Sequence, residues 1–221
     1  MAEELGQIPK MEVESFGEGR KLLLVPLMFA PMGAPDDLAE KVARYWDEVE
    51  SHISNLEAKL GSVVKVFHEL VPIGDEAGRT AMEELNKRSY EIVKRRLDED
   101  ARLELVEDIE LLTEFMDWSR CLAIGLQNPK VMAKVHESYL EVHKKRNEDI
   151  AGKIDAALEQ GEVGMLLIRE GHQVQFPQDI QVFYVAPPSL EDVKRWLRDR
   201  EQELMRQQAG QAEGEEQGNS T

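Results

Sequence analysis

Three residues of this sequence are of a type and at a position suited to catalysis or ligand binding: His172, Glu69 and Arg146. His172 follows Gly171, shortly after the apolar run 163–169, and a histidine there can bind a metal ion or act as a base. Glu69 lies near the end of the apolar run 62–71, where its carboxylate can bind the same metal or assist the histidine. Arg146 can clamp an anion or hold Glu69 in place. We therefore treat these three residues as candidate catalytic residues, with His172 and Glu69 as candidate metal ligands.

Arg146 interrupts an otherwise apolar helix face. The expected helix over about 130–160 carries an apolar stripe made of Val135, Tyr139, Val142, Ile150, Ile154 and Ala157. Arg146 occupies the same stripe, four residues from both Val142 and Ile150. A guanidinium on a core face needs a partner. That partner is either an anionic ligand or a buried acidic neighbour, and the sequence leaves both open.

Other polar residues have structural explanations. His68 and Glu69 are consecutive, so on a strand they point to opposite faces and only one can face a given site. His136 and His143 are seven residues apart, whereas histidine pairs that bind zinc on a helix lie four apart. We expect both to be solvated or to serve packing. We expect the acidic face from Glu107 to Asp117 to be a solvated helix surface.

The elements that must position these residues follow from the apolar pattern. Continuous or alternating apolar runs predict four strands, at residues 21–29, 62–71, 163–169 and 180–185. Pro26 cannot donate to a ladder, so the first strand is expected to end near Val25 or to lie at an edge. Periodic apolar stripes predict helices over about 36–61, 76–98, 102–126, 130–160 and 190–206.

This order predicts an α/β fold: a small, mainly parallel sheet with flanking helices and a helical insertion between the second and third strands. Sites in such sheets form at the carboxyl ends of the strands, where Glu69 and His172 both fall. We expect one domain over residues 21–207, with a helical subdomain at about 75–160. Residues 1–20 are expected to be a disordered arm, and residues 208–221 a disordered acidic tail.

Composition argues against several classes of function. The 221-residue chain has a net charge of −17, which disfavours nucleic acid as a partner. No apolar run reaches the ~18 residues of a membrane-spanning helix. The acidic beginning lacks an apolar signal region and there is one cysteine, Cys121, so a cytoplasmic location is expected. The chain has neither a G-x-G-x-x-G motif nor a Walker-type loop.

The segment from Arg146 to Val185 resembles the closing module of the TraB/ChaN-like superfamily, which includes the erythromycin-esterase-like and Tiki proteins. Arg146-Asn147, Ile150-Ala151 and Ile154 match the family's helix, Gly171-His172 match its strand end, and His68-Glu69-Leu70 looks like its second strand. The resemblance implies a pocket containing Glu69, Arg146 and His172. It also implies hydrolysis. The sequence leaves open whether a divalent metal serves as a cofactor.

Two further interpretations stay open. The loop after the first strand has no histidine, where the family carries one, and this favours a non-catalytic protein-interaction domain. Such a domain would use a protein partner or a second copy of the chain, whereas the enzyme would take a small polar ligand. ALEQGEVGMLLI, at residues 157–168, is similar to a helix–turn–strand of class-one peptide release factors, which implies a ribosome-associated protein. The Gly-Gly-Gln loop of those factors is absent.

Overall fold

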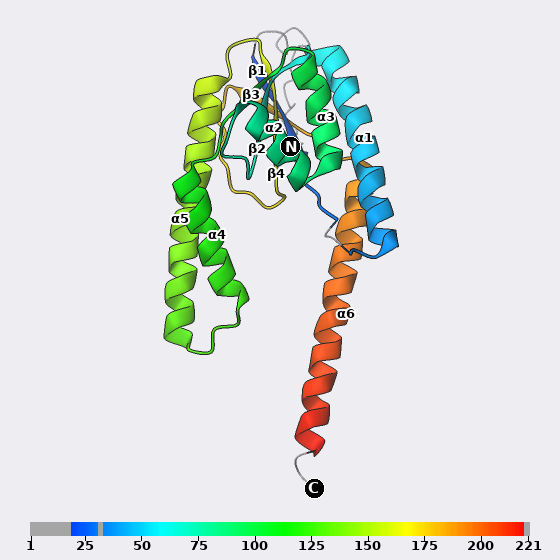
Figure 1. The fold of residues 1–221 in the computed structure, drawn as a ribbon, viewed down its shortest axis with the longest axis vertical. Coiled ribbons are helices and arrows are strands. Elements are labelled where there is room, and N and C mark those ends of the chain that lie inside the picture. Colours follow the sequence, from blue (N-terminus) through cyan, green and yellow to red (C-terminus); the bar gives the residue numbers. More distant parts are fainter. Residues whose placement is uncertain (1–18, 31–32, 219–221) are drawn as a thin grey trace, which may run out of the picture.

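The computed structural model describes residues 19–30 and 33–218, and it confirms the α/β fold class (Figure 1). Five strands form one sheet in which every pairing is parallel. They are β1 (Arg20–Pro26), β2 (Val63–His68), β3 (Arg102–Glu104), β4 (Val163–Ile168) and β5 (Ile180–Tyr184). The order across the sheet is β3-β2-β4-β1-β5. All the carboxyl ends therefore lie at one edge, which is where a site is expected.

The strands β1 and β4, which pair with each other inside the sheet, are the most completely buried ones. Every residue of β1 and of β4 is buried, because helices cover both faces of a parallel sheet and leave no solvated side. β1 lies between β4 and β5, so of the two alternatives that Pro26 suggested, an edge position is wrong. Pro26 is the last residue of β1, where a missing N–H disturbs the ladder least.

Six helices within the described ranges form the outer layers. One face of the sheet is covered by α1 (Asp36–Leu60), α2 (Asp75–Leu85), α3 (Lys87–Asp98) and the start of α6 (Pro188–Gly218), and on it Leu23 and Val25 join the core. The other face is covered by the second half of α5 (Pro129–Ala157), against Leu22 and Leu24. α4 (Ile109–Ala123) packs beside the first half of α5, and the two form a hairpin that extends past the carboxyl edge of the sheet (Figure 1).

The helices depart from the sequence prediction at three places. The helix expected over 76–98 is broken at Asn86, whose side chain accepts from the Ser89 N–H and donates to the Met28 carbonyl oxygen. The helix expected over 102–126 starts instead as strand β3, and α4 begins only after the N-cap residue Asp108. The stretch 75–160 does not pack as one subdomain, because its helices divide between the two faces of the sheet.

The C-terminal helix is longer than the sequence predicted. α6 continues to Gly218, well past the end expected near Arg206, and so includes most of the segment that we expected to be a disordered tail. The predicted arm falls almost entirely on residues 1–18, which lie outside the described residues. No helix in the described ranges combines the length and the apolar character needed to cross a membrane.

Candidate functional site

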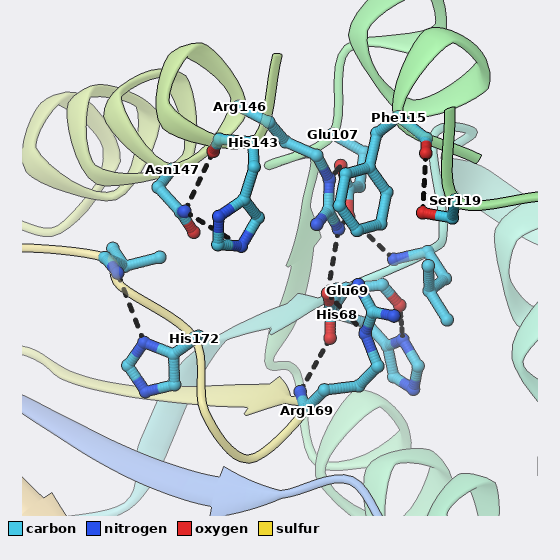
Figure 2. Close-up of polar contacts among 12 residues, drawn as sticks. His68, Glu69, Glu107, Phe115, Ser119, His143, Arg146, Asn147, Arg169 and His172 are labelled. Carbon is cyan, nitrogen blue, oxygen red and sulfur yellow. Dashed lines mark hydrogen bonds and ion pairs between the residues drawn. The ribbon is translucent and has the colours of Figure 1, made fainter. Parts of the chain in front are cut away.

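The three residues singled out in the sequence line one cavity of about 290 Å³ at the carboxyl edge of the sheet. Glu69 directly follows β2, His172 follows β4, and Arg146 reaches the edge from α5 (Figure 2). Arg146 Nη2 donates to Glu69 Oε1 at 2.9 Å. No hydrogen bond among the described residues joins His172 to either of the other two. The structure therefore brings the predicted residues together, with one direct ion pair among them.

Glu107 is the main partner of Arg146, and it was not among the site residues predicted from the sequence. Arg146 Nε donates to Glu107 Oε2 at 2.9 Å, and Nη2 donates to Glu107 Oε1. The Leu70 N–H also donates to Glu107 Oε1, at 2.8 Å. Glu107 is only 4% exposed, so its expected place on a solvated helix face is wrong. The physical reason is that α4 begins after Asp108, which leaves Glu107 in the preceding loop and turned inward.

Arg169 is a second residue of the site that was not predicted from the sequence. Its backbone N–H donates to Glu69 Oε2 at 2.6 Å, and its Nε donates to Glu69 Oε1 at 3.0 Å. Burial alone would raise the pKa of Glu69, but the charges of Arg169 and Arg146 and their hydrogen bonds outweigh burial and hold that pKa below its ordinary value. Glu69 is therefore a fixed anion between two guanidinium groups.

An aromatic wall from α4 and α5 closes one side of the cavity. The guanidinium carbons of Arg146 and Arg169 lie 4.9 and 5.2 Å from the centroid of the Phe115 ring. The His143 ring stacks on both Phe115 and Tyr139. These contacts hold both cations against an aromatic face, where cation–π attraction adds to their ion pairs.

Each arginine keeps one amino group free for a ligand. Arg146 engages its acidic partners through Nε and Nη2, and Arg169 does the same with Glu69. Within the described part of the chain, neither Nη1 has a hydrogen-bond partner, and both arginines line the cavity. Two N–H donor groups with positive charge are thus available at one place, which is the arrangement that binds a carboxylate or phosphate.

Two histidines add neutral donors. Burial lowers the pKa of His172, and its Nδ1 accepts from the Val174 N–H at 3.3 Å, so its proton resides on Nε2. Burial, followed by the charge of Arg146, lowers the pKa of His143. His143 Nε2 lies 3.2 Å from the amide nitrogen of Asn147, which places its proton on Nδ1. In these states both rings present an N–H rather than a free lone pair.

His68 belongs to the core and not to the cavity. Its Nδ1 donates to the Glu69 carbonyl oxygen at 2.5 Å, and it is only 1% exposed. Its Nε2 is buried without a partner among the described residues. Of the two consecutive candidates, Glu69 is therefore the one that faces the cavity.

The residues present do not fit the divalent metal that Glu69 and His172 were expected to hold. Both Glu69 oxygens already accept hydrogen bonds, and two guanidinium charges lie beside them. His172 Nδ1 is engaged by a backbone N–H. No group of three or more histidine, cysteine or acidic residues in the described ranges is arranged to hold a metal ion. A metal at this place would be repelled by Arg146 and Arg169.

The arrangement can thus bind an anionic group, or stabilise negative charge that develops on a ligand, through donors on Arg146, Arg169, His172 and His143. Glu69, Glu107 and Glu170 lie near these donors, and each of them is already paired with a cation. Comparison of the chain with protein-family models, with curated proteins and with solved structures finds no match.

Proposed function

We propose that the cavity at the carboxyl edge of the sheet binds a small ligand through an anionic group. The observation that carries this proposal is that the Nη1 groups of Arg146 and Arg169, two residues of one cavity, have no hydrogen-bond partner among the described residues. Glu69 and Glu107 hold both guanidinium groups in position before a ligand arrives. A preorganised pair of donors loses little conformational entropy on binding, which favours affinity.

The proposal extends to a relationship with the TraB/ChaN-like superfamily. Glu69, Arg146 and His172 carry the resemblance in sequence and line one cavity in space, which supports the relationship. Hydrolysis is the second candidate function, because several donors face the place where negative charge would develop on an ester or amide ligand. In that reaction the His172 N–H would stabilise the developing charge, since its Nδ1 is not free to act as the base.

Replacing Arg169 with methionine tests the binding function. We expect the variant to lose at least tenfold in affinity for acetate and for inorganic phosphate, because a hydrogen bond to a charged group contributes about 1.5–3 kcal/mol. The measurement is a titration followed by NMR chemical shifts of the histidine ring protons, at constant ionic strength with chloride as the background anion.

The matched control is Arg79→Met. Arg79 also pairs with a carboxylate, that of Asp98 at 3.0 Å, but it lines none of the cavity described above. Its loss should leave both affinities unchanged. Absence of saturable binding of either anion to the unaltered protein would refute the proposed function.

A further inference from the structure

The anion-binding cavity adjoins a second cavity of about 330 Å³. Both are lined by Asn147 and Gln173, so the two lie side by side along α5, and we refer to them together as the groove. Along α5 the groove extends from Tyr139 to Ala151, which at ~1.5 Å per helical residue is about 18 Å. A small anion would fill only one end of it.

The other wall of the groove is the segment after β4. Gln173 and Gln175 are exposed and line the second cavity, whereas Val174 between them is buried in the core. This alternation is typical of an extended chain. Among the described residues, no hydrogen bond is made by the backbone N–H of Gln173, Gln175 or Phe176. The groove is therefore bordered by backbone groups that are free to pair with a ligand.

The two ends of the groove differ in chemistry. At one end lie the free Nη1 groups of Arg146 and Arg169 and the His172 N–H. At the other end lie the methyl group of Ala151 and the aliphatic stems of Lys144 and Glu148. A ligand that fits both ends carries an anion at one terminus and a side chain of moderate size farther along.

An extended peptide satisfies this pattern better than an acyl chain does. A peptide supplies N–H and C=O groups to the backbone of residues 173–176, where the N–H groups of Gln173, Gln175 and Phe176 make no hydrogen bond among the described residues. This is strand addition, and the terminal carboxylate of the peptide supplies the anion. An acyl chain would cover the same backbone and glutamine groups without bonding them, which costs free energy.

We propose that the groove binds the C-terminal end of a peptide in extended conformation. The terminal carboxylate lies on Arg146 and Arg169, the main chain runs beside residues 173–176, and an upstream side chain fills the cavity at Ala151. From Arg146 to Ala151 the groove follows α5 for about 7.5 Å, which at ~3.3 Å per extended residue holds two or three residues of the peptide. The proposal rests on the anion-binding function proposed above and specifies the class of ligand.

The experiment is a calorimetric titration of the full chain with acetate and with N-acetylated peptides of one to eight residues, in which serine and valine alternate. Affinity should rise with each added residue up to two or three and then level off. The C-terminal amide of the six-residue peptide should bind at least tenfold more weakly than the free acid, because it lacks the charge that Arg146 and Arg169 bind.

A substitution separates the two ends of the groove. Ala151→Trp fills the second cavity, so it should reduce the affinity of the six-residue peptide at least tenfold and leave acetate binding unchanged. Acetate binding by this variant also shows that it is folded. Lys153→Trp places the same side chain on α5 at a position that lines neither cavity, and it should leave both affinities unchanged.

The outcomes distinguish this proposal from the one on which it rests. Binding of acetate with no gain from peptide length, or equal binding of acid and amide, overturns the peptide proposal and leaves the anion site intact. Tighter binding of decanoate than of the six-residue peptide overturns it in favour of an acyl chain. No binding of acetate, phosphate or peptide overturns both proposals.

Discussion

Replacing Arg146 with methionine is expected to lower the free energy of unfolding by about 3–5 kcal/mol, as removal of one partner from a buried ion pair does. Arg146 is 2% exposed and bonds two carboxylates that are themselves 2% and 4% exposed. Methionine fills much of the same volume, so the loss is mainly electrostatic: Glu107 loses its guanidinium partner, and Glu69 retains only Arg169. Urea denaturation followed by tryptophan fluorescence measures the change.

Neutralising the carboxylates provides the control for this prediction. In the Arg146→Met background, Glu69→Gln and Glu107→Gln together remove both buried charges and should recover much of the lost stability, because an uncharged buried group needs no counterion. Arg79→Met, at a more exposed ion pair, should cost about 1 kcal/mol or less. A change below about 1 kcal/mol for Arg146→Met alone would show that water reaches the cluster and compensates both carboxylates.

The second large effect is an acid-induced loss of stability that originates at His68. Burial lowers the pKa of His68 to about 4 from an ordinary value of 6.5. Below pH 6.5 the unfolded chain binds a proton at this residue that the folded chain does not bind, so stability falls as the pH falls. The contribution is complete above pH 6.5 and is lost by about pH 4. It amounts to roughly 3 kcal/mol, at about 1.4 kcal/mol per pH unit of difference between the two pKa values.

His68→Asn tests the origin of this effect. Asparagine can keep a donor to the Glu69 carbonyl oxygen in place of Nδ1, but it does not titrate. Stability measured by urea denaturation between pH 6.5 and 5 should depend less steeply on pH in the variant, by about 1 kcal/mol per pH unit. This window lies above the range in which Glu69 binds protons, because the pKa of Glu69 is lowered. His52→Asn, at an exposed histidine, should leave the slope unchanged; an unchanged slope in His68→Asn would contradict the assignment.

The sequence predicted part of the site because part of the site breaks a local pattern. Arg146 stands on an apolar helix face, and Glu69 and His172 stand at the ends of apolar runs, so each is visible without knowledge of the fold. Glu107 is not visible in this way, since it sits among acidic residues that suit a solvated helix. The N-cap preference of Asp108 was the available signal, because it would have started the helix after Glu107. Arg169 gave no signal, because a charged residue after a buried strand is ordinary.

The fold was predictable to a similar extent and for similar reasons. Apolar runs in the sequence predicted four of the strands. The strand that they did not predict, β3, has only three residues, Arg102–Glu104, and none of them is fully buried. Its place in the sheet depends on pairing with β2, which no local pattern encodes. The break at Asn86 likewise depends on a contact with Met28, which lies far away in the sequence. Contacts between distant segments decided each of these elements.

The position of β1 inside the sheet has a consequence for biosynthesis. Of the described strands, β1 leaves the ribosome before the others, yet both of its hydrogen-bonding neighbours, β4 and β5, follow Glu162. During most of translation an uncharged stretch, Leu22–Pro26, therefore has no native strand to pair with. The nascent chain must keep this stretch from aggregating until β4 emerges. We expect the emerging chain to depend on chaperones that hold exposed apolar segments, and to complete its sheet only late in synthesis.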